Sequence, residues 1–322
     1  MSSTTPDTPN DRSRNAASRS NVMIAVIVVL LLLVPVAWIG TDAWQQHRRL
    51  ERLRSMRARY NTERHGSAWV HDLLMTRLGP HYAESVRDVV SLVFERRPLS
   101  VDAVRWLHEF PRLTALHLLD VGLTDAHLAP LSHMTQLRTL ALKGTGITDR
   151  GFAQLAPLTN LRQIMLRDSQ LTGDALKHLS GLTSLDTLTI EADRLGKDGI
   201  GHLAGLPGLH RLELHYAPGS TVDLELLHRL PALTSLTLET DTLPPGTIDH
   251  IAKVTSLRGL TLIGPEVTDE DLRTLQSMPD LKRLAMYRVV VSQEAVDAFR
   301  KARPDCRLEG KRRRVSGRSP AP

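Results

Sequence analysis

A single cysteine, few aromatic residues and no catalytic signature characterise this sequence of 322 residues. Cys306 is the only thiol, which excludes an internal disulfide framework and a zinc site built from cysteines, because each needs at least two. Aromatic residues make up 4% of the chain and hydrophobic residues 41%, so the core has to be aliphatic, as in regularly stacked repeats. The P-loop, serine-hydrolase, zinc-protease and kinase motifs are all absent. We therefore expect neither an enzyme nor a protein that depends on a cofactor or metal ion.

The positive charge of the chain lies at its two ends. The net charge is +6 and the sequence pI is about 9.8. Residues 1–64 contain ten arginines and five acidic residues, and residues 309–322 contain five basic residues and one glutamate, so the part between them is mildly acidic. Basic residues confined to the termini favour contact with anionic lipid headgroups over a nucleic-acid groove. We expect a membrane and no nucleic acid among the partners.

The N-terminal region predicts a single membrane span. Residues 1–21 are polar and are expected to be disordered. Residues 22–40 contain no charge and, as a helix, are about 28 Å long, close to the thickness of the hydrocarbon core. Residues 41–64 form a basic juxtamembrane stem. A cleaved signal peptide is the alternative, although residues 22–40 are longer than a typical secretory h-region.

The charges that flank this span indicate a cytoplasmic location for the body of the protein. Three basic residues lie within 20 residues before residues 22–40, and six lie within 20 residues after them. The positive-inside rule then places the C-terminal part in the cytoplasm. An extracytoplasmic location stays open, because long domains translocate largely regardless of charge.

The central part of the chain repeats every 24 residues. Leucine recurs at each first position, followed by apolar residues at positions 4 and 6, where positions are counted from that leucine. This alternation predicts a short strand, and the apolar residues at positions 11, 16, 19 and 22 predict a short helix. Threonine or serine at position 12 predicts a helix N-cap. The first leucines are Leu113, Leu137, Leu161, Leu185, Leu209, Leu233, Leu257 and Leu281, and a degenerate copy begins at Val89.

Repeats of this kind bury their apolar faces only by stacking. We expect an α/β solenoid over residues 89–308, with parallel strands on its concave side and helices on its convex side. Residues 65–88 are expected to form an N-terminal cap, and residues 309–322 a disordered basic tail. Cys306 is expected to be a buried residue of the C-terminal end rather than a nucleophile.

Two segments within the repeats resemble a known family. LKGTGITD at residues 142–149 and GFAQLAPLTNL at residues 151–161 are similar to leucine-rich repeats of the class L-x-x-L-x-L-x-x-T-x-V-T-D. Membrane-anchored bacterial proteins of the planctomycete type carry this class, as do F-box-type ubiquitin-ligase receptors. The resemblance implies a horseshoe-shaped repeat domain, and residues 301–308 resemble the closing cap of the bacterial version. It is specific for the fold and unspecific for the function.

The concave face provides the candidate partner-binding residues. At position 7, Lys143 and Arg167 are followed by Glu191, His215 and Glu239, so the face is expected to be bipolar and to bind a bipolar partner in one direction. Glu213 at position 5 completes a ring of three carboxylates around His215. Tyr216 and Tyr287 are the expected aromatic anchors. His178, His202 and His250 share position 18 and are expected on the convex helices, too far apart to bind one metal ion together.

These features favour a membrane-tethered, non-catalytic module whose concave face binds a protein or peptide. Two alternatives stay open. One is an F-box-type substrate receptor, although no adaptor-binding helical module is evident in the sequence. The other is an enzyme that uses His215 with Glu191, Glu213 and Glu239 as an acid–base or metal-binding cluster.

Overall fold

The computed structural model describes residues 44–64, 87–217, 220 and 222–310. The chain divides into two compact units, one made of Met1–Arg57 with Thr62–Asp88 and the other of Ala58–Asn61 with Val89–Pro322. In the first unit, residues 44–55 are helical and bury Leu50 and Leu53. The predicted domain boundaries are not tested by this division and stay predictions.

The predicted membrane localisation has to be corrected. None of the helices in the described part of the chain is long and apolar enough to cross a membrane. Spanning a bilayer takes about 20 apolar residues, whereas helix α10 (Gln293–Ala302), for example, has ten. This finding contradicts a single-pass membrane protein with a cytoplasmic repeat domain. Residues 22–40, on which the prediction was based, lie outside the described residues, as do residues 1–21, 65–86 and 311–322.

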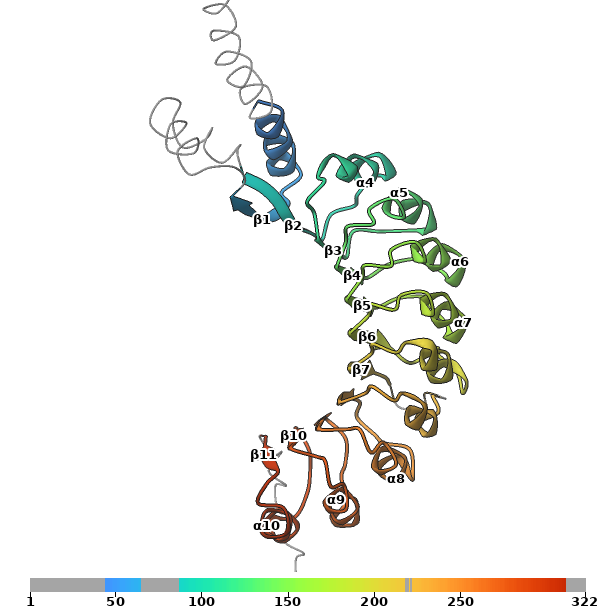
Figure 1. Cartoon of the computed structure of the whole chain (residues 1–322), viewed down its shortest axis with the longest axis vertical. Coiled ribbons are helices and arrows are strands. Elements are labelled where there is room, and N and C mark those ends of the chain that lie inside the picture. Colours follow the sequence, from blue (N-terminus) through green and yellow to red (C-terminus); the bar gives the residue numbers. More distant parts are fainter. Residues whose placement is uncertain (1–43, 65–86, 218–219, 221, 311–322) are drawn as a thin grey trace, which may run out of the picture. The chain divides into compact units, whose positions relative to one another are not determined.

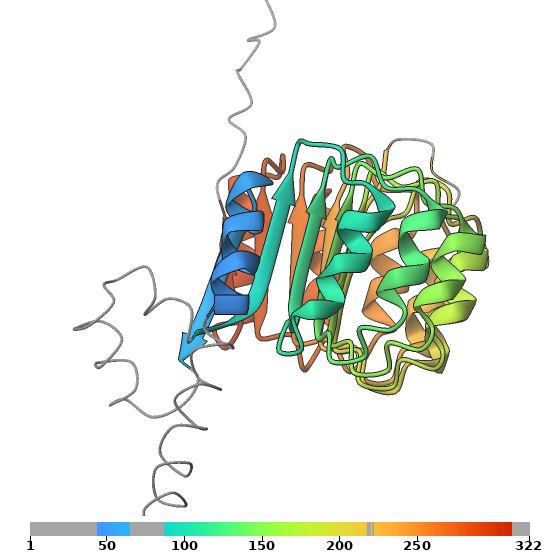
Figure 2. The same cartoon turned by 90° about the horizontal axis from the view of Figure 1, so that it is seen from above.

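Eleven short strands form one sheet in which the spatial order follows the chain order. From β2 onward neighbouring strands are parallel, and each residue pairs with the residue 24 positions later, as in Leu140 with Ile164 and Leu284 with Leu308. Figure 2 shows the strands side by side. The strands are β1 (Arg59–Arg64), β2 (Arg87–Glu95), β3 (Ala115–Leu119), β4 (Thr139–Lys143), β5 (Gln163–Arg167), β6 (Thr187–Glu191), β7 (Arg211–His215), β8 (Ser235–Glu239), β9 (Gly259–Ile263), β10 (Arg283–Tyr287) and β11 (Arg307–Glu309).

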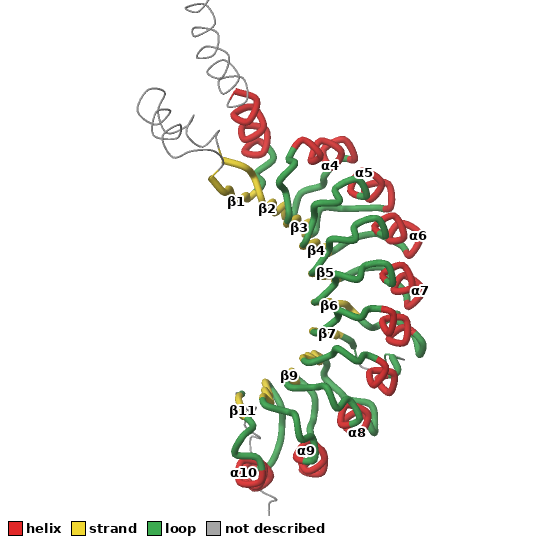
Figure 3. The backbone as a smooth tube through the Cα atoms, in the orientation of Figure 1, coloured by secondary structure: helices red, strands yellow, loops and turns green. Residues whose placement is uncertain are grey.

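Within the second unit, short helices follow the strands and lie on the outer side of the curved sheet (Figures 1 and 3). The α-helices after the first unit are α4 (Val101–Trp106), α5 (Leu128–Leu131), α6 (Asp149–Phe152), α7 (Gly173–Leu176), α8 (Thr247–Ala252), α9 (Asp269–Gln276) and α10. The 3-10 helices are η1 (Leu107–Glu109), η2 (Asp125–His127), η3 (Ala153–Leu155), η4 (Lys177–Leu179), η5 (Gly199–Gly205) and η6 (Leu224–Arg229). The α/β solenoid expected from the repeat is therefore confirmed.

The repeated apolar positions form the core between sheet and helices. In β7, Leu212 and Leu214 are at most 1% exposed, while the residues between and beside them are half-buried or exposed. Phe152 and Leu155 from the helical half of an earlier repeat are equally buried. Cys306 is buried at the C-terminal end, as expected, and burial raises the pKa of its thiol.

Carboxylates at position 13 tie successive repeats together. The carboxylate of Asp149 accepts hydrogen bonds from the N–H and the hydroxyl of Thr172 in the next repeat, at 2.8 and 2.5 Å. Asp125 with Thr148 and Asp269 with Ser292 repeat this clamp. The Thr172 hydroxyl also accepts from Asp174 N–H as the expected N-cap, so one side chain both begins a helix and joins two repeats.

The last repeat is closed by a buried arginine. Arg303 is 9% exposed and donates to the carbonyl oxygens of Gln276, Met278, Pro279 and Leu281. It also contacts Asp305 at 3.0 and 3.2 Å, and this contact holds the pKa of the Asp305 carboxyl well below its usual range. The guanidinium thus satisfies carbonyl groups for which no further complete repeat supplies partners.

Replacing Arg303 by methionine should lower the free energy of unfolding by about 3 kcal/mol, because buried carbonyl groups lose a charged donor. Urea denaturation followed by circular dichroism measures the change. The control is Arg300→Ala on the same helix, where the lost contact is an exposed ion pair with Asp297 and the expected loss is below about 0.5 kcal/mol. Equal losses in the two variants would contradict a capping role for Arg303.

Replacing Asp149 by alanine should cost about 1 to 2 kcal/mol, because two hydrogen bonds between repeats are lost and the Thr172 N–H is left without its acceptor. Asp249→Ala, which removes an exposed carboxylate from helix α8, serves as the control and should change stability by less than about 0.5 kcal/mol. A loss no larger than that of the control would mean that the clamp does not stabilise the stack.

Candidate functional site

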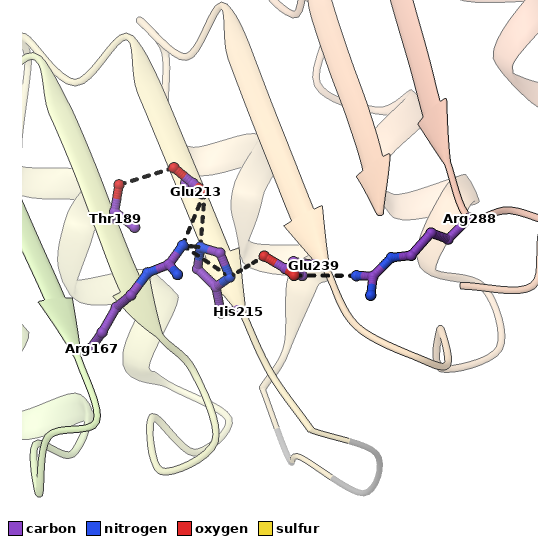
Figure 4. A network of polar contacts seen from close by, with 6 residues as sticks. All are labelled: Arg167, Thr189, Glu213, His215, Glu239 and Arg288. Carbon is purple, nitrogen blue, oxygen red and sulfur yellow. Dashed lines mark hydrogen bonds and ion pairs between the residues drawn. The ribbon is translucent and has the colours of Figure 1, made fainter. Parts of the chain in front are cut away.

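A network of charged side chains crosses the concave face over strands β5 to β8 and ends at Arg288 (Figure 4). His215 lies at its centre, with its side chain 12% exposed. Its Nδ1 is 2.7 Å from Glu239 Oε2, and its Nε2 is 2.9 Å from Glu213 Oε1. Arg288 contacts the other oxygen of Glu239 at 3.2 Å.

Arg167 joins this network from the strand two positions away. Its Nη2 lies 2.5 Å from His215 Nε2 and 3.5 Å from Glu213 Oε1. When Nε2 carries no proton it accepts from Arg167; when it is protonated it donates to Glu213, and Arg167 loses this acceptor. The hydrogen bond from His215 is the main cause that lowers the pKa of Glu213.

Glu191 does not complete the expected ring of three carboxylates around His215. Its Oε2 instead accepts a hydrogen bond from Asp168 N–H at 2.7 Å. The pairing of β5 with β6 ends at Leu166 and Ile190, one rung earlier than in the neighbouring pairs, so the side chain takes the place of a backbone acceptor. Burial raises the pKa of Glu191, and repulsion from Asp168 and Asp193 adds to this effect.

The predicted positive half of the face is neutralised within the chain. Lys143 Nζ lies 3.7 Å from Asp120 and 3.8 Å from Asp168. Arg167 turns toward Glu213, and its Nε is buried without a hydrogen-bond partner among the described residues. The expectation that both cations point freely to solvent is therefore corrected: nearby carboxylates hold them against the sheet.

The two predicted aromatic anchors differ in exposure. Tyr287 is partly exposed, but Tyr216 is only 6% exposed and cannot serve as an exposed anchor. Met165 on β5 is 39% exposed. In the neighbouring strands its register partners are Ala141 and Thr189, which are short, so the thioether projects above them.

Tyr216 is buried because the backbone leaves strands β6 to β8 differently from the others. In the repeats that begin at Leu113, Leu137, Leu161, Leu257 and Leu281, position 8 has a positive φ, is not buried, and precedes a buried or half-buried position 9. In the three repeats between them position 8 lacks the positive φ and is buried, and position 9 is exposed. The inverted pairs are Ala192 with Asp193, Tyr216 with Ala217, and Thr240 with Asp241.

The residue types at position 8 carry part of this signal. Asp120, Gly144, Asp168 and Gly264 are types that tolerate the left-handed region, and alanine, tyrosine and threonine are not. Arg288 also adopts a positive φ, at 58°. Sequence reasoning that assumes one conformation for every repeat therefore misses the inversion.

On the convex side, one group of side chains has the composition of a metal site. Ligand atoms of Asp223, Glu225 and His250 lie within 4.8 Å of one another. Lys253 Nζ is already 3.7 Å from Glu225 and supplies positive charge there. His178 and His202 are not part of this group.

Comparisons with known proteins agree on the type of repeat. A family model described as a leucine-rich repeat region matches residues 105–315. An internalin from Listeria monocytogenes is 20% identical, with 77% of this chain and 71% of that chain covered and a TM-score of 0.49.

The leucine-rich-repeat ectodomain of the Arabidopsis thaliana receptor kinase GASSHO1/SCHENGEN3, solved in complex with CASPARIAN STRIP INTEGRITY FACTOR 2, is 21% identical. It is matched over 64% of this chain and 25% of that chain, with a TM-score of 0.37. No curated protein matches the sequence.

Replacing Glu191 by glutamine should stabilise the protein at pH 7 by a few tenths of a kcal/mol, about 0.5 at most, because the charge is partly exposed. A carboxyl whose pKa is raised by folding stabilises the folded state below its unfolded pKa. This contribution is lost as the pH rises through the folded pKa. The gain should therefore shrink as the pH falls toward 4.

Urea denaturation between pH 4 and 7 measures this difference. Glu266→Gln, at an exposed carboxylate away from the network, controls for the loss of one charge. A Glu191→Gln variant that is less stable than the wild type at pH 7 and recovers on acidification would contradict the assignment.

Proposed function

Because the chain belongs to the leucine-rich-repeat family, we propose that it is a non-catalytic binding module whose concave face takes a protein or peptide partner. Leucine-rich repeats are interaction scaffolds, since stacked repeats present an extended concave surface. The subclass of planctomycete-type proteins stays a prediction.

The observation that carries the proposal is the exposed thioether of Met165 beside the charged network. Met165 is 39% exposed in the middle of an ordered strand, and its register partner Thr189 donates to Glu213 of the network at 3.1 Å. An adaptable apolar side chain next to a polar rim is the arrangement of an interface anchor. We propose Met165 with Lys143, Arg167, Glu191, Glu213, His215, Glu239 and Tyr287 as the partner-binding residues.

An acid–base role for His215 is less well supported. Both ring nitrogens lie within hydrogen-bonding distance of partners in the chain, Glu239 on one side and Glu213 with Arg167 on the other. A general base needs a nitrogen that reaches the substrate. The network therefore favours a surface that fixes charges in place over one that transfers a proton.

Replacing Met165 by glutamate should weaken partner binding at least tenfold, because a desolvated apolar contact is replaced by a charge. The test takes a partner captured by crosslinking to the full-length chain and measures its Kd by titration. His178→Glu and His202→Glu on the convex side are matched controls and should leave the Kd within about twofold. If the convex variants abolish binding while Met165→Glu and Lys143→Glu do not, the concave face is not the binding surface.

A further inference from the structure

The inverted strand exits of β6 to β8 enclose a pocket of about 370 Å³ at the edge of the concave sheet. It is lined by residues at positions 7 to 9 of three successive repeats, together with Arg167 and Arg288. Figure 4 shows these two arginines on opposite sides of His215. The pocket exists because position 9 faces outward only in these repeats.

The charges that line the pocket do not balance. Its arginines are engaged, Arg288 with Glu239 and Arg167 with the Glu213–His215 pair. Three further carboxylates make no ion pair within the described part of the chain: those of Glu191, Asp193 and Asp241. Glu191 and Asp193 accept only backbone N–H groups, from Asp168 at 2.7 Å and Ala217 at 2.5 Å. Negative charge is thus left for a ligand to neutralise.

The small residue between two of these carboxylates leaves room for a ligand group. Asp193, Ala217 and Asp241 occupy position 9 of consecutive repeats, so the two aspartates are separated by two strand spacings, about 10 Å. Ala217 contributes only a methyl group between them. A planar cationic group fits this gap with a carboxylate on each side.

The hydroxyl of Tyr216 provides a second, independent indication of a ligand. Tyr216 lines the same pocket, is only 6% exposed, and its hydroxyl has no hydrogen-bond partner among the described residues. A buried hydroxyl without a partner costs free energy. Burial also raises the pKa of Tyr216, so the group stays a neutral hydroxyl that can accept or donate.

We propose that this pocket binds the guanidinium group of an arginine side chain of the partner, an inference that rests on the proposed binding function. A guanidinium has five donors in one plane, enough for carboxylates on two sides and for the tyrosine hydroxyl, whereas a lysine ammonium has three on a point charge. Repulsion from Asp168 and Asp193 on the Glu191 carboxylate is relieved when a cation enters.

The test uses the full-length chain and a small probe, N-acetyl-L-arginine amide, titrated by ligand-observed NMR. N-acetyl-L-citrulline amide, which has nearly the same shape without the charge, should bind at least tenfold more weakly, and N-acetyl-L-lysine amide should bind more weakly than the arginine probe. Asp193→Asn with Asp241→Asn should reduce arginine binding at least tenfold. The matched control, Asp198→Asn with Asp249→Asn, removes the same charge from exposed residues outside this pocket and should leave binding within twofold.

Tyr216→Phe separates a ligand contact from a structural role. It should weaken binding of the arginine probe about threefold while the midpoint of urea unfolding stays the same or rises, because an unsatisfied hydroxyl is removed. A drop in stability with unchanged affinity would overturn the assignment of the hydroxyl to the ligand.

Failure of this inference is distinguishable from failure of the proposed function. Equal binding of the arginine and citrulline probes, or equal losses in the pocket and control variants, overturns the guanidinium pocket. If Met165→Glu still weakens the captured protein partner in that case, the concave binding function stands. Loss of partner binding in the Asp193 and Asp241 double variant together with loss of the arginine probe supports both.

Discussion

Parallel pairing of residues 24 positions apart is the constraint on which the rest of this structure depends. It aligns the buried leucines of neighbouring strands, such as Leu188 and Leu212, so each repeat covers the apolar face that its neighbour cannot cover alone. The same register brings side chains at positions 5 and 7 into columns about 4.8 Å apart on the concave side. A stack of this kind has ends, and at the C-terminal end Arg303 supplies the missing hydrogen bonds.

Polar contacts between repeats divide the stack into a regular part and an irregular part. Where position 13 is aspartate, as in Asp125, Asp149 and Asp269, its carboxylate holds the following repeat at position 12. At the equivalent positions Gly173, Lys197 and Pro245 no such carboxylate exists. The inverted strand exits occur in the repeats that follow or contain these residues. The regular repeats therefore provide the rigid scaffold, and the irregular ones form the pocket.

The fold could be predicted from the sequence because it depends on the leucine period, which no local choice of conformation alters. The burial of Cys306 and the N-cap role of Thr268 were correct for the same reason. The exposure of Tyr216 was not, because it depends on whether φ is positive at position 8. Aspartate and glycine indicate the turned form there, but Arg288 adopts it as well, so residue type alone does not decide.

The charge of the concave face was the least predictable property, because side chains neutralise one another across strands before any partner arrives. Arg167 reaches Glu213 over 46 residues of sequence, and Lys143 lies between Asp120 and Asp168. A column of residues read from the sequence counts these charges as available, whereas a partner meets only what internal pairing leaves. What remains is the apolar Met165 together with the carboxylates of Glu191, Asp193 and Asp241. This surface matches a partner with an apolar side chain and a cationic one more closely than a bipolar partner.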